Sequence, residues 1–160
     1  NILRGRMFAG VYSNMGGLNC EENLRRVARD LHTLIRPGGF FIGTFLGDVA
    51  IWEILAFVAR GKLKQALRRR TPEGSPANVG GSIVQTFYYS PGAVADAFSP
   101  HFARVELLGL NICTPPPTSQ QAYRRFGKGI RLFERIDDTI MRHSPFNRIG
   151  DHFVIVLKHE

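Results

Sequence analysis

The sequence has few cysteines and no long apolar run, and both shortages exclude classes of protein. Only Cys20 and Cys113 occur in the 160 residues, far apart and without CxxC spacing, so neither a disulfide framework nor a zinc finger is indicated. No apolar run reaches the roughly 18 residues that a membrane span needs. The best candidate, residues 49–58, is short and contains Glu53. We therefore expect a cytoplasmic protein without a membrane span, with two reduced thiols.

Several catalytic signatures are also missing. The sequence contains no GxSxG, HExxH or phosphate-binding P-loop pattern, which argues against the corresponding hydrolases and nucleotide triphosphatases. The histidines are scattered, and no pair has metal-ligand spacing with a third partner close in sequence, so no metal site is predicted. They are His32, His101, His143, His152 and His159.

Positive charge is abundant. The formal net charge is +8, from 21 Lys and Arg against 13 Asp and Glu. The basic residues concentrate in residues 60–70 and 124–131, which both have helical patterns. A solvated helix face is the ordinary interpretation, and a contact with nucleic acid or an anionic surface is the alternative. With 44% hydrophobic and 21% charged residues, we expect a single globular domain over residues 1–160.

The first third of the sequence predicts a βαβ unit. The β-prone run Phe8–Ser13 ends in Asn14-Met15-Gly16-Gly17, which indicates a buried strand followed by a glycine loop. Asn19 precedes two glutamates, as an N-cap in a capping box does, and apolar residues then follow at helical spacing. Pro37-Gly38-Gly39 ends that helix, and residues 40–46 are almost continuously apolar, as in a strand buried on both faces. The two strands should be parallel.

The rest of the sequence predicts alternating helices and strands. We expect Asp48 to cap a helix over residues 49–60, followed by a basic helical stretch to Arg70 and a loop over residues 71–81. Residues 61–81 would together form a surface insertion. The further expected elements are a strand over 82–89, a helix opened by Ser90-Pro91, a strand over 102–110, a helix over 120–141 weakened at Gly127 and Gly129, and a strand over 152–158.

The ordered series of motifs resembles the class I S-adenosylmethionine-dependent methyltransferases over nearly the whole chain. Residues 8–20 resemble the fourth strand and its loop, and Ile35-Arg36-Pro37-Gly38-Gly39 resembles the signature before strand five. Trp52-Glu53 resembles an insertion seen in a bacterial subgroup, and Tyr88-Tyr89-Ser90-Pro91 resembles the turn that starts a late helix. Residues 102–110 and 152–158 match strands six and seven. The sequence departs from the family at Ala9, where an acidic residue usually follows the strand-four Phe.

The resemblance implies an α/β fold: a partial Rossmann-like methyltransferase sheet with parallel strands and an antiparallel pair at one edge. The chain would supply only the C-terminal half of it. Strands one to three, which carry the glycine-rich turn and the acidic residue that grip S-adenosylmethionine, would lie outside the sequence. We therefore expect a fragment or truncated member that binds no cofactor alone, and whether it is an enzyme by itself stays open.

The resemblance also assigns candidate site residues. Ser13, Asn14, Met15 and Leu18 would form part of the floor of the S-adenosylmethionine site, at the carboxyl ends of the strands where ligands of open α/β sheets bind. Ordinary loop hydrogen bonding or core packing is the alternative role for them. Trp52, Glu53, Tyr88 and Tyr89 would line the pocket of a small-molecule methyl acceptor, with core packing as the alternative. No catalytic residue is identified.

Two other functions stay open. Without strand one, Phe8–Ser13 would be an unpaired apolar edge, able to pair with a second copy or with a separate N-terminal partner. The chain would then be a non-catalytic module. A nucleic-acid or anionic-surface binder is the less favoured possibility, and it predicts a steep dependence of binding on salt.

Overall fold

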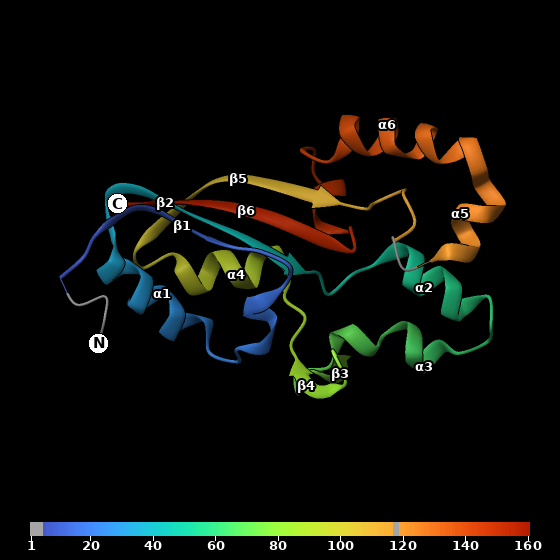
Figure 1. The fold of residues 1–160 in the computed structure, drawn as a ribbon, viewed down its shortest axis with the longest axis horizontal. Helices are drawn as coiled ribbons and strands as arrows, with labels where there is room; N and C mark the ends of the chain where they lie inside the picture. Colours follow the sequence, from blue (N-terminus) through green and yellow to red (C-terminus); the bar gives the residue numbers. More distant parts are fainter. Residues whose placement is uncertain (1–4, 117–118) are drawn as a thin grey trace.

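The computed structural model describes residues 5–116 and 119–160. It is a mixed α/β structure with a four-stranded sheet and a separate two-stranded hairpin (Figure 1). The elements are β1 (Phe8–Ser13), η1 (Gly17–Cys20), α1 (Leu24–Leu34), β2 (Ile35–Leu46), α2 (Ile51–Val58), α3 (Leu63–Ala66), η2 (Arg68–Arg70), β3 (Ser75–Val79), β4 (Ser82–Thr86), α4 (Pro91–Phe98), β5 (Phe102–Leu110), α5 (Gln120–Phe126), η3 (Gly127–Gly129), α6 (Ile130–Ile140), η4 (Phe146–Arg148) and β6 (His152–His159).

The main sheet has the order β1-β2-β6-β5. β1 pairs in parallel with β2, with Val11 opposite Phe41 and Ser13 opposite Gly43. β6 lies antiparallel between β2 and β5. The predicted parallel pair and the predicted antiparallel pair at the opposite edge are therefore both confirmed.

The Pro-Gly-Gly segment lies inside the range of β2 instead of before it, because the strand begins at Ile35. The pairing with β1 is interrupted there, between Phe8 and Gly10. Gly38 has φ +75°, and a Cβ on Gly39 would lie 2.7 Å from the carbonyl oxygen of Ala9. Only glycine allows this change of direction without a clash.

The core lies on one face of the main sheet, under α1 and α4 (Figure 1). Phe41 stacks on Phe98 of α4 with ring centroids 5.1 Å apart, and Phe45 stacks on Phe153 at 5.5 Å. Leu24, Ala28 and Leu31 are the buried positions of α1, at the helical spacing that the sequence showed.

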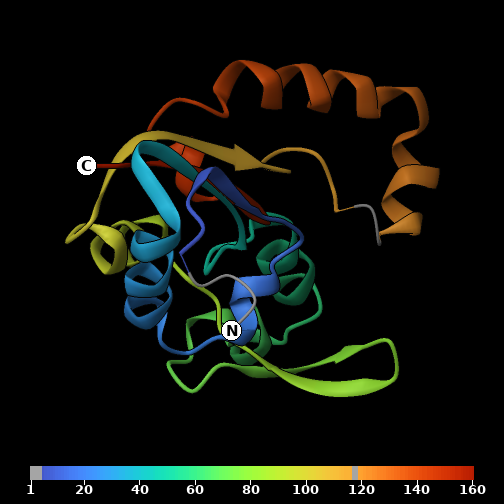
Figure 2. The same ribbon diagram turned by 60° about the vertical axis from the view of Figure 1, so that its left-hand side comes forward.

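The opposite face of the sheet is only partly covered. Tyr12 is 61% exposed and Phe40 is 40% exposed, although both lie on strands of the main sheet. α6 runs beyond β5 on that side and leaves the β1 end open (Figures 1 and 2). The sheet therefore presents apolar surface beside its β1 edge.

The two edges of the main sheet differ. Among the described residues, β1 pairs on one side only. β5 has an irregular register between Arg104 and Glu106, the Glu106 carboxylate pairs with Arg142, and the Gly109 amide donates to the carbonyl oxygen of Met141 at 2.9 Å. Bulges, charges and covering segments protect a sheet edge from further strands. β5 has such protection, whereas no strand among residues 5–116 and 119–160 pairs with the outer side of β1.

Two predicted caps are wrong. The cap of α1 is Asn23, whose side chain accepts from the Arg26 amide, while Asn19 is fully buried in η1. The residue before α2 is Ala50 and not Asp48, and it makes no side-chain cap. The Ser90 cap of α4 is confirmed, since its hydroxyl accepts from the Ala93 amide at 3.1 Å.

Other boundaries also differ from the predictions. The expected loop over residues 71–81 contains β3, which pairs with β4 as a hairpin that projects from the body of the molecule (Figure 2). The basic stretch before it forms only the short α3 and η2. The long C-terminal helix is interrupted at Gly127–Gly129, where a weak point was predicted. In the described part of the chain, no helix has both the length and the apolar character needed to cross a bilayer.

Candidate functional site

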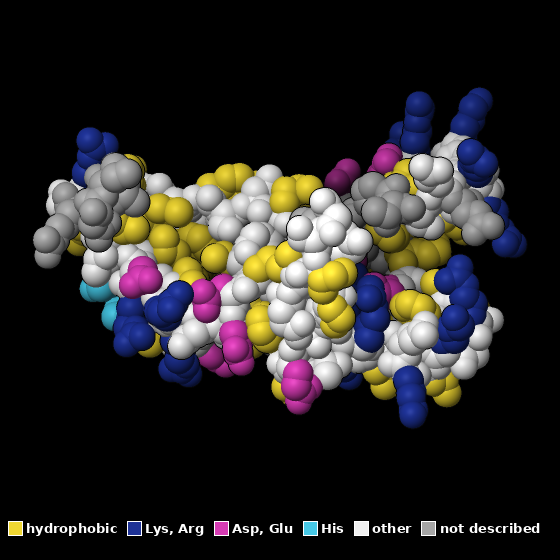
Figure 3. Space-filling view, turned by 60° about the horizontal axis from the view of Figure 1, so that its bottom comes forward, with side chains coloured by type: hydrophobic (Ala, Val, Ile, Leu, Met, Phe, Trp, Pro, Cys, Tyr) yellow, Lys and Arg dark blue, Asp and Glu magenta, His cyan; other side chains and the backbone are white. Residues whose placement is uncertain are grey.

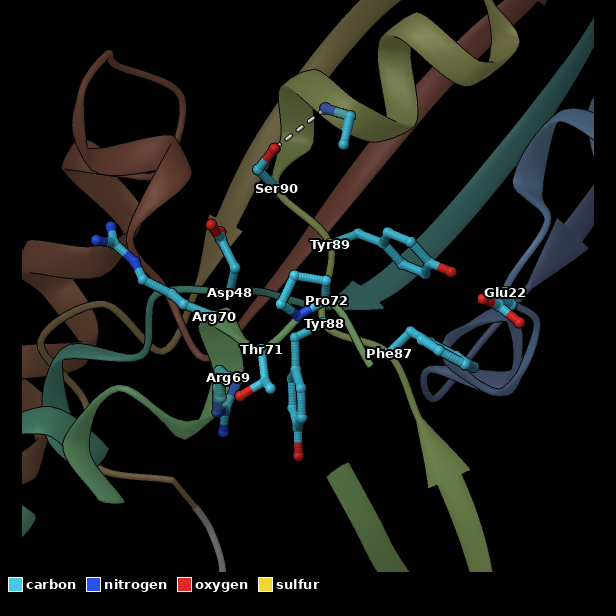
Figure 4. Close-up of a pocket in the computed structure, with 11 residues that line it drawn as sticks. Glu22, Asp48, Arg69, Arg70, Thr71, Pro72, Phe87, Tyr88, Tyr89 and Ser90 are labelled. Atoms are coloured by element: carbon cyan, nitrogen blue, oxygen red, sulfur yellow. Dashed lines mark hydrogen bonds between the residues drawn. The ribbon is translucent and has the colours of Figure 1, made fainter. Parts of the chain in front are cut away.

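A cavity of about 460 Å³ lies near the end of β2 (Figure 4). The parallel strands β1 and β2 end at Ser13 and Leu46, and Gly47 forms a bridge with Tyr89. That bridge brings the segment after the β3–β4 hairpin to the carboxyl ends of the strands, where open α/β sheets bind ligands. The cavity is lined by Glu22, Asp48, residues 69–72, residues 87–90 and Ala93.

Asn19 joins the parts around this cavity. Its amide nitrogen donates to the carbonyl oxygens of Leu46 at 3.1 Å and of Phe87 at 2.6 Å, and its side-chain oxygen accepts from the Leu46 amide at 2.9 Å. The side chain is fully buried, so each of these bonds satisfies a group that water cannot reach. Asn19 thereby fixes the η1 loop to the end of β2.

The four candidate cofactor residues lie on the loop that leaves β1. Asn14 and Met15 are exposed, and the Met15 amide donates to the Asn14 side chain at 2.8 Å. Met15 has φ +56°, a conformation that non-glycine residues seldom adopt. Ser13 is half-buried, and Leu18 packs against the hydrophobic core.

Arg69 is the centre of the polar network beside the cavity. Its guanidinium contacts Glu53 at 2.9 Å and Asp151 at 2.6 Å, and it also donates to the carbonyl oxygens of Gly47 at 3.1 Å and Asp151 at 3.2 Å. It lies 4.9 Å from the centroid of the Tyr88 ring. The Arg69 side chain is 9% exposed. It therefore joins α2, the end of β2, the start of β6 and the cavity wall.

The network sets the ionisation of its carboxylates. Burial alone would raise the pKa of Glu53, but hydrogen bonds from Arg68 and Arg69 outweigh burial and lower it. Burial also opposes ionisation of Asp151, and His152 and Arg69 together lower its pKa. Both groups are therefore anionic at neutral pH. Burial and the nearby glutamates 21 and 22 raise the pKa of Tyr89 to about 12.

The four candidate acceptor residues divide between two cavities. Tyr88 and Tyr89 line the cavity at the end of β2. The Tyr89 hydroxyl donates to the Glu21 carbonyl oxygen at 2.5 Å. Trp52 and Glu53 line a second cavity of about 600 Å³ between α2 and α5. The Glu53–Arg69 ion pair connects the walls of the two cavities.

Three histidines meet at the opposite end of the sheet. His32 Nδ1 lies 2.7 Å from His159 Nε2, and the His32 and His101 rings stack at 4.3 Å. His159 Nδ1 donates to the Ile35 carbonyl oxygen at 2.7 Å, so its Nε2 accepts from His32 when the ring is neutral. Loss of hydration and the neighbouring His101 and His159 lower the pKa of His32. Nothing in the described residues forms a group of three or more potential ligands suited to a metal ion.

Sequence reasoning missed the roles of Arg69, Asp151 and Asn19. Arg69 lies in a run of three arginines that suggested a solvated face. In the structure Arg68 and Arg70 are exposed, but Arg69 is buried. Asp151 is 82 residues away from Arg69. A short-range pattern contains no signal for a pair so far apart.

No protein-family model matches the chain, and no curated protein matches it. Among solved structures, the chain is similar to an S-adenosylmethionine-dependent methyltransferase from Mesorhizobium loti, with a TM-score of 0.48 and 12% sequence identity. The similarity covers 99% of this chain and 66% of that one, just under two thirds.

Proposed function

We propose that the chain supplies the C-terminal half of a class I S-adenosylmethionine-dependent methyltransferase, which transfers a methyl group to a small-molecule acceptor when strands one to three are present. The sequence resemblance implied a parallel pair crossed by a helix and an antiparallel pair at the far edge. β1, α1 and β2 form the first part, and β5 and β6 form the second.

The open β1 edge is the observation that carries this proposal. A parallel strand at an edge, beside an incompletely covered apolar face, is the expected state of a sheet that continues in another segment. Tyr12 and Phe40 lie on that face and are exposed. Further strands and their helices would cover both the edge and the face.

The residues of the chain fit the cofactor only in part. The η1 loop, residues 13–20, contains no acidic residue to accept from ribose hydroxyls. Its Gly16 allows close packing within the protein, since a Cβ there would lie 3.1 Å from Asn19 Oδ1 and 3.3 Å from Leu46 Cγ. These residues can contribute a floor but no carboxylate to hold the ribose hydroxyls, so the chain alone should not hold S-adenosylmethionine.

In the complete enzyme, the cofactor supplies the methyl group on its sulfonium. Ser13, Asn14, Met15 and Leu18 would form the floor beside it, and Tyr88 and Tyr89 would bound the acceptor. The Arg69 guanidinium lies over the Tyr88 ring, and Glu53 pairs with Arg69. Catalysis of this kind depends mainly on positioning. Tyr89 is a wall residue and not a base, because its hydroxyl proton is already donated to a carbonyl group.

Calorimetric titration with S-adenosylmethionine tests the proposal. Residues 1–160 alone should give no micromolar binding, whereas a longer protein in which a further segment supplies strands one to three should bind the cofactor. In that longer protein, Asn14→Ala should weaken binding several-fold, with Arg124→Ala on the distant α5 as the control. Micromolar binding to residues 1–160, or none to the longer protein, would overturn the proposal.

A non-catalytic role through strand pairing is the second candidate, and the same exposed edge favours it. β1 of one copy could pair with β1 of another, because its outer hydrogen-bonding groups have no strand partner among the described residues. Light scattering should then show a dimer, and Tyr12→Lys should dissociate it by placing like charges at the junction. A strictly monomeric chain at high concentration would exclude this candidate.

A further inference from the structure

The second cavity, between α2 and α5, has a mostly apolar lining. Trp52, Phe57 and Phe126 contribute aromatic surface, with the Trp52 and Phe126 rings 5.9 Å apart. The indole nitrogen of Trp52 donates to the Cys113 carbonyl oxygen at 2.6 Å, so the polar atom of Trp52 is already satisfied. Leu55, also in the lining, is 55% exposed. The groove therefore offers apolar surface that the described residues leave open.

Arginines contribute to the lining of the same groove. Arg68 is neutralised by Glu53, with Nε 2.7 Å from Oε1. Arg60 and Arg125 also line the groove and are exposed, and neither forms an ion pair within residues 5–116 and 119–160. Figure 3 shows basic side chains gathered at the end of the molecule that carries α2, α3 and α5, with hydrophobic surface between them. The groove therefore combines an apolar lining with two uncompensated positive charges.

We propose that this groove binds a small organic anion with an apolar body, such as an alkyl or aryl carboxylate. The apolar body would lie against Trp52 and Phe126, and the carboxylate would pair with Arg60 and Arg125. A volume of about 600 Å³ suits a single small molecule, and arginine is well suited to bind a carboxylate. A concave groove accommodates such a molecule better than it accommodates a flat bilayer. The inference stands whether or not the chain takes part in methyl transfer.

The fluorescence of Trp52 provides a local test, because it is the only tryptophan in the chain. The probes are octanoate and octan-1-ol, which share the same alkyl chain and differ in charge. Octanoate should change the Trp52 emission with saturation below its micellar concentration, and octan-1-ol should bind roughly 25-fold to 100-fold more weakly, because it loses the charge-assisted contacts with both arginines. The apolar sheet face contains no tryptophan, so binding there would not give this signal.

Substitutions distinguish binding at the groove arginines from a general attraction of anions to this positively charged protein. Arg60→Gln and Arg125→Gln should each weaken octanoate binding about fivefold to tenfold, while leaving octan-1-ol binding unchanged. Arg124→Gln, on the same helix but outside the groove lining, is the matched control and should have no effect. Circular dichroism checks the fold of each variant. In the unsubstituted protein, a higher salt concentration should weaken octanoate binding.

Three results would overturn the inference. Equal binding of octanoate and octan-1-ol would show a groove without charge recognition. Octanoate affinity unchanged in both Arg60→Gln and Arg125→Gln would show that these arginines do not bind the anion. A Trp52 response to vesicles of anionic phosphatidylglycerol but not to monomeric octanoate would show that this region contacts membranes instead.

Discussion

Replacing the buried Arg69 should strongly lower the free energy of unfolding of this protein. Arg69→Met keeps most of the apolar length of the side chain and removes its charge. The substitution leaves the carboxylates of Glu53 and Asp151, which are 17% and 13% exposed, without their shared partner. The carbonyl oxygen of Gly47 also loses its donor. Breaking a buried ion pair from one side typically costs about 3–5 kcal/mol.

The neighbouring Arg68 is the matched control. Its side chain is 42% exposed and pairs with Glu53 alone, and exposed pairs contribute about 0–1 kcal/mol. Urea unfolding monitored by circular dichroism should therefore give a free energy of unfolding about 3–5 kcal/mol lower for Arg69→Met and at most about 1 kcal/mol lower for Arg68→Met. Equal effects of the two substitutions would refute the central role of Arg69.

The pH dependence of this difference tests the same reasoning. In the folded protein the pKa values of Glu53 and Asp151 are lowered, so their contribution is present above their ordinary values near 4. It is lost as the pH falls through the folded values. In Arg69→Met the two carboxylates keep only Arg68 and His152 as partners, so they should protonate more readily, which removes the cost of burying their charge. The stability difference should therefore be smaller at pH 4 than at pH 7, and a difference that grows on acidification would contradict this account.

Three further changes should have measurable effects on the free energy of unfolding. Asn19→Ala removes three buried side-chain hydrogen bonds and should cost about 2–4 kcal/mol, whereas Asn14→Ala, at an exposed position, should cost under about 0.5 kcal/mol. Ser90→Ala removes the cap of α4 and should cost about 1 kcal/mol; retention of the full melting temperature would contradict the capping role. His32 has a lowered pKa in the fold, so stability should fall as the pH decreases below about 6.5, and His32→Asn should make the curve flatter between pH 7 and 5.

The sequence predicted the main sheet well because its signals are local and repetitive. The apolar run Phe8–Ser13, the helical spacing up to Leu34 and the Pro-Gly-Gly segment lie within 40 residues of one another, and each follows from backbone or burial preferences. The Ser90 cap followed from the serine-proline pair in the same way. The resemblance added the antiparallel pairing of β5 with β6, which no local pattern contains.

Predictions were wrong where tertiary contacts override local preference. Asn19 has the sequence context of a cap, yet its side chain bonds to Leu46 and Phe87, because burying an amide between two chain segments satisfies more groups than a helix end would. The β3 strand contains Pro76 and lies between Gly74 and the pair Gly80-Gly81, so it looked like a loop. The four residues expected around one acceptor pocket line two cavities that the Glu53–Arg69 pair connects, and their role in binding an acceptor stays a prediction.

The unequal edges of the main sheet limit how copies of this chain can associate. Growth by strand addition needs two receptive edges per molecule, one to accept and one to donate, and only then does it propagate into a fibre. Here the bulge, the charged pair and the Met141 carbonyl occupy the β5 side. Two molecules that meet through β1 would use up the free edge of both, so the association should close at two copies and stay in solution.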